Sequence, residues 1–241
     1  MLIYAIGDIH GCIDELRIVY DKVKADAGDK EHVIITTGDY VDRGPDSKAC
    51  VQFLIDHMRI GKDYNLMGNH EDMLLANIRE FRPEGQDVWE KQQMGAAFFM
   101  NGGKQTMQSY DIPWDHPDPV SQLPPAHIDW FTRLHQCVIT DRHMFVHAGI
   151  DPTRPVDQQH RNQMMWIRDE FLRCKFPFER YIVHGHTPIG YDPLRPPQHL
   201  KSDPVILTNR VNLDTGACFG GKLTCAVFDP NINEPINIIQ N

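Results

Sequence analysis

The chain has 241 residues, and its 24 Lys and Arg against 33 Asp and Glu give a formal net charge of −9. This acidic balance disfavours a nucleic-acid partner that is bound by neutralising its phosphates, whereas an apolar fraction of 41% is typical of a globular protein. No segment reaches the roughly 20 apolar residues of a membrane-spanning helix. The N-terminal apolar run has no basic segment before it, so we expect no signal peptide, no membrane partner and a cytoplasmic location.

The first third of the chain alternates between strand and helix patterns. Short apolar runs, each ended by a glycine, predict buried strands at 2–6, 32–37 and 65–67. Helices are predicted between and after them, at 12–26, 47–59 and 71–80. Because parallel strands are joined by right-handed crossovers, this order favours a largely parallel first sheet.

The middle segment, 81–135, has a different character. Helical patterns at 87–100 and 103–110 are followed by a Pro-rich stretch, 112–125, whose prolines prevent a regular element. We expect this segment to be a helical and Pro-rich cap or rim insertion in a single domain that spans 1–241. A disordered linker between two domains is the alternative.

The last third returns to strand patterns. A hairpin is predicted where strands 137–140 and 144–146 flank Asp141–Arg142, and a helix is predicted at 163–174. Further strands are predicted at 181–183, 205–208, 211–213 and 222–228. The pair Gly220–Gly221 before the last of them is a hairpin turn signal. These strands predict a second, mixed sheet.

Polar clusters follow five of the predicted strands directly. They are Gly7–Gly11 (GDIHG), Gly38–Gly44 (GDYVDRG), Gly68–Glu71 (GNHE), His147–Gly149 (HAG) and His184–His186 (HGH). In open α/β sheets the ligand crevice lies beyond the carboxyl ends of the strands, so these clusters can converge on one site.

The residue types in these clusters are those of a two-metal site. Carboxylate, imidazole and amide oxygen suit Mn²⁺, Fe or Zn²⁺, and no cysteine is among them. Asp8 and His10 leave the same face of an extended segment and can hold one cation, and Asp39 can bridge two. Asn69, His147 and His186 can complete the second site. Taken singly, each has a structural alternative, since Gly-Asp is a common turn and Asn69 could form an Asx-turn.

In this order, the motifs GDIHG, GDYVDRG, GNHE, HAG and GH resemble those of the metallophosphoesterase superfamily. More narrowly, they resemble the PPP-type serine/threonine protein phosphatases of the bacterial and bacteriophage lambda type. The resemblance runs from residue 3 to about 228 and includes Trp166-x-Arg168 and Asp214-Thr-Gly-Ala. It implies an α/β, calcineurin-like fold, in which a central two-sheet β-sandwich is flanked by helices and carries a dinuclear metal centre at one edge.

The resemblance also implies roles for individual residues. Two divalent metal ions, Mn²⁺ first with Fe or Zn²⁺ as alternatives, would be bound by Asp8, His10, Asp39, Asn69, His147 and His186, with Asp39 shared. His70 would protonate the leaving oxygen while Asp42 orients it. The substrate phosphate would be held by Arg43, Arg168 and Asn69. His184 matches no such role, and we expect it to be structural.

The predicted function is therefore metal-dependent phosphomonoester hydrolysis, in which a metal-activated hydroxide attacks in line and His70 is the general acid. The substrate would be a phosphoprotein or a small phosphomonoester. The alternative is a symmetrical dinucleoside polyphosphate (Ap4A) hydrolase, which resembles the chain at Gly11–Leu16 and 43–47. Asp42 and Glu71 favour the phosphatase.

Two other readings have less support. A non-catalytic metal-binding scaffold that recognises phosphoproteins would not need every acid and phosphate-binding position to be filled. The sequence Asp214-Thr-Gly-Ala is also the aspartic-protease signature, but that chemistry needs two such carboxylates and the chain has one copy. The positive charge of two divalent metal ions and two arginines would exceed the negative charge of the site's three carboxylates, Asp8, Asp39 and Asp42. We therefore expect a positively charged site opening on a protein whose net charge is negative.

Overall fold

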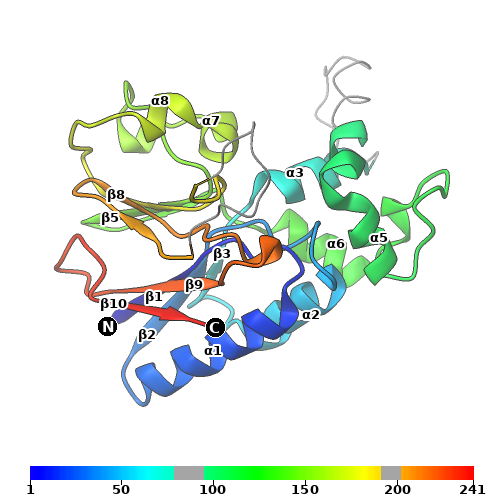
Figure 1. Ribbon diagram of the computed structural model, residues 1–241, viewed down its shortest axis with the longest axis horizontal. Coiled ribbons are helices and arrows are strands. Elements are labelled where there is room, and N and C mark those ends of the chain that lie inside the picture. The colour runs from blue at the N-terminus through cyan, green and yellow to red at the C-terminus, as the bar shows by residue number, and fades with distance from the viewer. Residues whose placement is uncertain (79–94, 191–201) are drawn as a thin grey trace.

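The computed structural model describes residues 1–78, 95–190 and 202–241 (Figure 1). Two five-stranded sheets pack face to face, and helices cover the outer face of each. This arrangement confirms the predicted two-sheet sandwich flanked by helices. In the described part of the chain, no helix is both long and apolar enough to cross a lipid bilayer.

The first sheet has the order β10-β9-β1-β2-β3. Its parallel strands are β1 (Leu2–Ile6), β2 (His32–Thr36) and β3 (Tyr64–Asn65). At one side, β9 (Thr224–Phe228) and β10 (Asn237–Gln240) pair antiparallel. The expectation of a largely parallel sheet thus holds for β1–β3 alone. The hairpin expected at Gly220–Gly221 is wrong, because β9 pairs with β1 and β10 rather than with the strand before it.

The second sheet has the order β4-β5-β6-β8-β7. Its parallel centre consists of β5 (His143–Val146), β6 (Tyr181–His184) and β8 (Arg210–Asn212). Its antiparallel edges are β4 (Cys137–Ile139) and β7 (Val205–Ile206). The mixed character and the β4–β5 hairpin are as predicted.

Strand periodicity divides the core into layers. In β1, Ile3 and Ala5 face the second sheet, whereas Tyr4 and Ile6 face the helices. The layer between the sheets consists of Ile3, Ala5, Ile35, Leu66, Phe145, Tyr181, Val183, Val211, Leu213, Ala226 and Phe228. Burial of each large apolar side chain stabilises the fold by about 1.5–3 kcal/mol. This layer fixes the two sheets against each other.

Two helices around the first sheet lie close to the predicted bounds, whereas the one predicted at 71–80 spans 69–76, and residues 79–80 lie outside the described part of the chain. In chain order they are α1 (Ile13–Ala27), α2 (Ser47–His57) and α3 (Asn69–Ala76). The amphipathic α1 buries Leu16, Val19 and Val23, as its spacing predicts. The Asp46 side chain caps α2 by accepting a hydrogen bond from the Ala49 amide at 2.8 Å.

The helix predicted at 163–174 is in fact two helices, α7 (Arg161–Trp166) and α8 (Asp169–Leu172). The break falls where Ile167 is extended (φ −60°, ψ 142°) and Arg168 has φ −132° and ψ −92°. Because Arg168 stands at this break, its Nη1 can donate to Thr187 Oγ1 at 3.0 Å. A continuous helix would not turn Arg168 in this direction.

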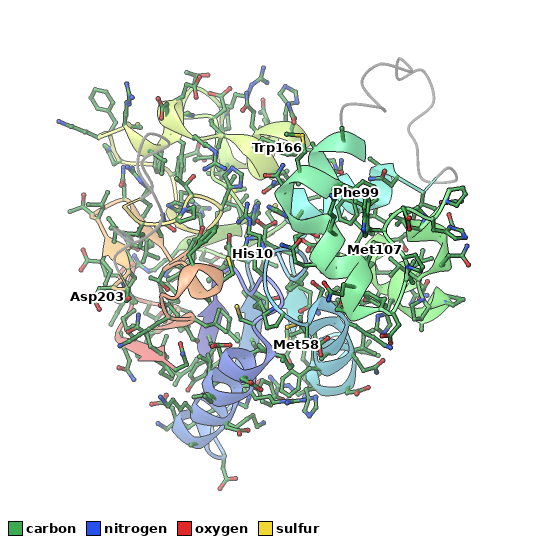
Figure 2. The ribbon with its side chains drawn as sticks, turned by 45° about the vertical axis from the view of Figure 1, so that its right-hand side comes forward. His10, Met58, Phe99, Met107, Trp166 and Asp203 are labelled. Carbon is green, nitrogen blue, oxygen red and sulfur yellow. The ribbon has the colours of Figure 1, made fainter. Side chains whose placement is uncertain are left out.

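The first part of the helix predicted at 87–100 lies outside the described residues. From residue 95 the chain is helical, passes through a π-turn at Phe99–Gly103 and continues as α5 (Lys104–Ser109). The Pro-rich stretch is mostly irregular, as expected, but contains a 3₁₀ turn at Val120–Gln122. It leads into α6 (Pro125–Thr132). Figure 2 shows Phe99 on the π-turn and Met107 on α5, both to one side of His10.

Candidate metal centre

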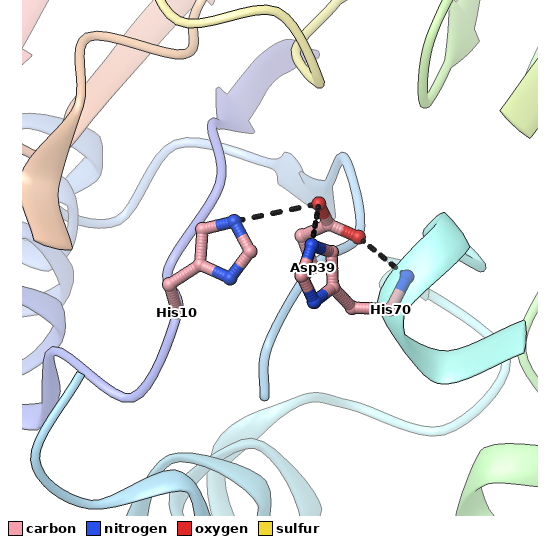
Figure 3. Close-up of side chains that lie close together, drawn as sticks. All are labelled: His10, Asp39 and His70. Atoms are coloured by element: carbon pink, nitrogen blue, oxygen red, sulfur yellow. Dashed lines mark hydrogen bonds and ion pairs between the residues drawn. The ribbon is translucent and has the colours of Figure 1, made fainter. Parts of the chain in front are cut away.

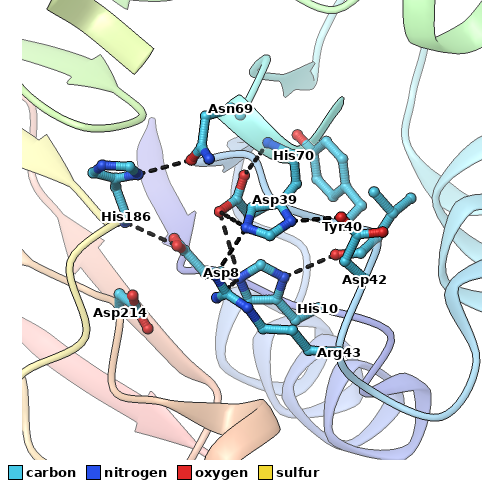
Figure 4. A network of polar contacts seen from close by, with 12 residues as sticks. Asp8, His10, Asp39, Tyr40, Asp42, Arg43, Asn69, His70, His186 and Asp214 are labelled. Atoms are coloured by element: carbon cyan, nitrogen blue, oxygen red, sulfur yellow. Dashed lines mark hydrogen bonds and ion pairs between the residues drawn. The ribbon is translucent and has the colours of Figure 1, made fainter. Parts of the chain in front are cut away.

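The carboxyl ends of the parallel strands of both sheets meet at one place (Figure 4). The first sheet contributes Asp8 and His10 after β1, Asp39, Asp42 and Arg43 after β2, and Asn69 and His70 from the start of α3 after β3. The second sheet contributes His147 after β5 and His186 after β6. All of these side chains are buried except that of Arg43, which is half-buried. The convergence expected from the strand ends is therefore present.

Backbone strain is concentrated at the same place. Six non-glycine residues in the described part of the chain have positive φ, and five of them belong to the site. They are His10 (46°), Asp39 (53°), Asp42 (72°), Arg43 (68°) and His186 (69°). The left-handed region costs a non-glycine residue about 1–2 kcal/mol. The surrounding fold must offset this cost, and the strained residues are the ones whose side chains converge at the site.

One cluster of possible metal ligands consists of His10, Asp39 and His70 (Figure 3). Asp39 Oδ2 lies 3.4 Å from His10 Nε2 and 3.8 Å from His70 Nε2. The other predicted ligand on this side, Asp8, lies beside this cluster. Its carboxylate accepts a hydrogen bond from the His186 amide at 2.8 Å and a longer one from Thr37 Oγ1 at 3.4 Å.

A second cluster consists of Asp39, His147 and His186. Asp39 Oδ1 lies 3.4 Å from His147 Nε2, so the two oxygens of this one carboxylate face the two clusters. Asn69 Oδ1 lies 2.9 Å from His147 Nε2 and 2.8 Å from His186 Nδ1. The structure thus brings together the residues that the sequence places around a second metal ion.

Several atoms that face one another in this second cluster are hydrogen-bond acceptors. His147 Nδ1 lies 2.9 Å from the Thr37 carbonyl oxygen, which can only accept, so Nδ1 carries the proton and Nε2 carries a lone pair. That lone pair faces Asn69 Oδ1 and Asp39 Oδ1, which are acceptors as well. His10 is oriented in the same way by the Val41 carbonyl oxygen at 2.8 Å, but its Nε2 lone pair accepts from Arg43. Acceptors that converge without a proton between them fit a cation.

Burial also keeps the histidines in the form that binds metal. It lowers the pKa of His147, and it lowers the pKa values of His10 and His186 well below the usual range. Burial alone would raise the pKa of Asp39, but the neighbouring histidines, His147 first, lower it overall. Neutral imidazoles around an ionised carboxylate are the protonation states that a divalent metal ion requires.

Asp42, His70 and Arg43 form a connected group at the edge of the first cluster. His70 Nδ1 lies 2.6 Å from Asp42 Oδ2. The guanidinium of Arg43 donates from Nη1 to His10 Nε2 at 2.7 Å and from Nη2 to His70 Nε2 at 2.9 Å. Arg168 adds positive charge from the second sheet's side and is among the groups that lower the pKa of His186. Two guanidinium groups at this place can give charge-assisted hydrogen bonds to an anion.

Glu71 has a part in the site that the sequence analysis missed. Its buried carboxylate accepts four backbone N–H groups: those of Asp39 at 2.9 Å, Tyr40 at 2.8 Å, Val41 at 3.2 Å and Gly68 at 3.1 Å. It therefore fixes the loop that carries Asp39 to the start of α3. An acidic residue at the third position of a helix is a capping signal that could have revealed this.

Asp214 was also not assigned to the site. It follows β8 and is buried, and its Oδ1 accepts a hydrogen bond from the Gly216 amide at 3.2 Å. Burial raises the pKa of Asp214 to about 6. The pKa of Asp8 is raised first by its own burial and then by the neighbouring Asp214 charge. The position of Asp214 after a strand of the parallel centre is the same signal that identified the other clusters. Figure 4 shows it on the side of Asp8 away from Asn69.

His184, expected to be structural, points away from these clusters into the apolar layer under α8. Its ring lies edge-on to Phe171 with 4.9 Å between centroids, and Nδ1 lies 3.1 Å from the Gly185 carbonyl oxygen.

The model of the calcineurin-like phosphoesterase family matches residues 1–221. The chain belongs to this family. The fold and the buried histidine and carboxylate clusters are those of a metallophosphoesterase, a hydrolase that uses divalent metal ions.

Among curated proteins, the chain is 26% identical to the asymmetrical bis(5'-nucleosyl)-tetraphosphatase PrpE of Oceanobacillus iheyensis, over 95% of this chain and 89% of that one. It is equally, 26%, identical to serine/threonine-protein phosphatase 1 of Salmonella typhimurium, over 93% and 90%. A symmetrical bis(5'-nucleosyl)-tetraphosphatase of Actinobacillus pleuropneumoniae is 36% identical over 36% of this chain and 32% of that one.

Among solved structures, one assigned as a diadenosine tetraphosphatase superposes with a TM-score of 0.63 at 20% identity, over 100% of this chain and 92% of that one. A cold-active protein tyrosine phosphatase superposes with a TM-score of 0.52 at 18% identity, over 93% and 73%. At these identities the likeness concerns the fold.

Proposed function

We propose that this protein is a phosphomonoester hydrolase, a serine/threonine protein phosphatase that also accepts small phosphomonoesters. The observation that carries the proposal is the buried pair of Asp42 Oδ2 and His70 Nδ1, 2.6 Å apart and next to the metal-ligand cluster. An alkoxide leaving group needs a proton as its bond to phosphorus breaks, and a histidine oriented by a carboxylate can supply one.

Each residue has a task in this proposal. Divalent ions held by the two clusters would polarise the phosphoryl group and activate the attacking water. Arg43 and Arg168 would donate to the phosphate oxygens and neutralise the charge that develops on them. Asp42 would keep the His70 ring oriented, so that Nε2 faces the leaving oxygen once a phosphate takes over the Arg43 donors. In the structure Nε2 accepts from Arg43 and Nδ1 donates to Asp42. Once the phosphate holds Arg43, Nε2 would take up a proton from water and transfer that proton to the leaving oxygen.

Hydrolysis of dinucleoside polyphosphates is the second candidate, because relatives of both kinds are 26% identical to the chain, over 95% and 93% of its length. Symmetrical enzymes match the chain too: one is 36% identical over 36% of it, and another, from Janthinobacterium, is 26% identical over 93% of it. Asp42 supports the phosphatase, since a nucleotide or phosphate leaving group departs as a stable anion and depends less on an acid. Glu71, which follows Asn69-His70 where those hydrolases typically carry Asp, supports it too.

The test is to compare kcat/KM of the Mn²⁺-loaded protein on a phosphoserine peptide, p-nitrophenyl phosphate and diadenosine tetraphosphate. We expect both monoesters to exceed the dinucleotide by about tenfold or more. A preference for diadenosine tetraphosphate would replace the proposal with the second candidate. No turnover of any of the three by a fully metallated protein would instead favour the phosphoprotein-recognition scaffold.

A further inference from the structure

Thr106 contacts Asp42 from outside the strand-end motifs. It lies on α5 and is completely buried. Its hydroxyl donates to Asp42 Oδ1 at 2.5 Å and accepts from the Asp42 amide at 2.8 Å. Because the other carboxylate oxygen, Oδ2, faces His70 Nδ1, a continuous chain of hydrogen bonds connects α5 to the proposed acid.

Each polar hydrogen in this hydrogen-bonded network has an identifiable acceptor. The single hydroxyl hydrogen of Thr106 goes to Asp42 Oδ1, so the Ser47 hydroxyl, 3.2 Å away, is the donor in its contact with Thr106. Ser47 Oγ also accepts from the Asp42 amide at 3.0 Å. Each oxygen of the buried Asp42 carboxylate then has one donor. A residue without a hydroxyl at 106 would leave Oδ1 unpaired, which is costly for a buried carboxylate.

The backbone before Thr106 also packs on the same loop. Gly102 has φ 113°, and a Cβ atom there would lie 2.4 Å from the Arg43 amide nitrogen and 3.0 Å from Asp42 Cβ. Only a glycine allows this approach. Asp42 and Arg43 both have left-handed φ values, so the segment Gly102–Thr106 supports the strained part of the loop directly.

We propose that Thr106 is a positioning residue for phosphomonoester hydrolysis: it fixes the Asp42 carboxylate, and Asp42 in turn fixes His70 for protonation of the leaving oxygen. This inference rests on the proposed function. It assigns a role in the reaction to α5, which lies between α3 and β4 and belongs to none of the strand-end motifs.

The test uses two substrates that differ in their need for an acid. The leaving group of a phosphoserine peptide is the strongly basic serine alkoxide. The leaving group of p-nitrophenyl phosphate is the stable p-nitrophenolate, which needs an acid much less. For the Mn²⁺-loaded protein, we expect Thr106→Val to lower kcat on the phosphopeptide by about 10-fold to 100-fold and on p-nitrophenyl phosphate much less. Thr106→Ser, which keeps the hydroxyl, should restore the phosphopeptide activity, and metal content should be unchanged in both variants.

Ser109→Ala is the matched control. It removes a hydroxyl from the same helix, but one that contacts only backbone, namely the Thr106 carbonyl oxygen at 2.7 Å and the Lys48 amide at 3.1 Å. We expect it to affect both substrates alike. If Thr106→Val does not fold, Thr106→Ala removes the hydroxyl together with the γ-methyl group and places no new methyl beside the Asp42 carboxylate.

The outcomes separate the two proposals. Equal losses on both substrates after removal of the Thr106 hydroxyl, or no rescue by Thr106→Ser in a folded protein, would overturn the positioning role. A wild-type protein that hydrolyses neither monoester would overturn the proposed function itself.

Discussion

The imidazole rings of His10 and His70 meet edge to face, with their centroids 4.6 Å apart and their planes at 80°. Each ring directs Nε2 at a different nitrogen of the Arg43 guanidinium. One planar side chain therefore contacts a candidate metal ligand and the candidate acid at the same time. A phosphate that binds Arg43 is brought to both of them.

Replacement of Arg43 by Lys should lower kcat/KM on phosphomonoesters by about 100-fold, because an ammonium group cannot give two parallel hydrogen bonds to one phosphate. The loss should appear together with weaker inhibition by inorganic phosphate, measured by competition. Arg17→Lys on the exposed face of α1 is the control and should behave as wild type. Unchanged phosphate inhibition in Arg43→Lys would contradict the assignment.

Replacement of His70 by Asn should lower kcat on a phosphoserine peptide by about 10²-fold to 10⁴-fold, the range for loss of a general acid. Metal content, measured by mass spectrometry, should stay at the wild-type level, since His70 is assigned to proton transfer and not to metal binding. His57→Asn, at an exposed position on α2, is the control. Metal loss in the His70 variant would show instead that His70 is a ligand, as its place in the first cluster allows.

Asp39 is the one residue common to both clusters of possible ligands. We expect the wild-type chain to retain two Mn²⁺ ions after dialysis and Asp39→Asn to lose at least one, because the amide has one coordinating oxygen and no charge. Metal analysis and calorimetric titration measure this. Asp14→Asn, an exposed carboxylate at the start of α1, should leave the stoichiometry unchanged. One ion in the wild-type chain would rule out a dinuclear centre.

Burial lowers the pKa of His184 to about 3 from 6.5. The unfolded chain therefore takes up a proton below about pH 6.5 while the folded chain does not, so stability present above this pH is lost as the pH falls. His184→Gln should make the decline between pH 6.5 and 4 shallower by up to about 1.4 kcal/mol per pH unit. Urea unfolding at several pH values measures both slopes, and equal slopes would be inconsistent with a buried neutral His184.

Much of the site follows from short-range signals. Strands such as β1 and β6 are apolar runs followed at once by glycine, aspartate or histidine, and the carboxyl ends of parallel strands share one edge of a sheet. The pairing partner of strand β9 could not be predicted in this way. The sequence of β9 predicts a strand, but its partner β1 is more than two hundred positions away, and no local pattern specifies that pairing.

The helix break at Arg168 and the Thr106 contact were not predictable for a related reason. Thr106 is 64 residues from Asp42 in the chain, and only tertiary packing of α5 brings it to the carboxylate. The apolar spacing of 163–174 suits one helix, whereas the structure breaks it at Ile167 and Arg168. In both cases long-range contacts override the local pattern.

The predicted ligands are divided between the two sheets, so bound metal ions would link two halves of the molecule. Asp39 and Asn69 belong to one half and His147 and His186 to the other, and neither half holds a complete set. The affinity for metal ions would therefore depend on the free energy with which the two sheets pack together. By linkage, bound ions would stabilise that packing. Loosening the apolar layer between the halves, for example with Phe228→Ala, should weaken metal binding although Phe228 is not among the ligands.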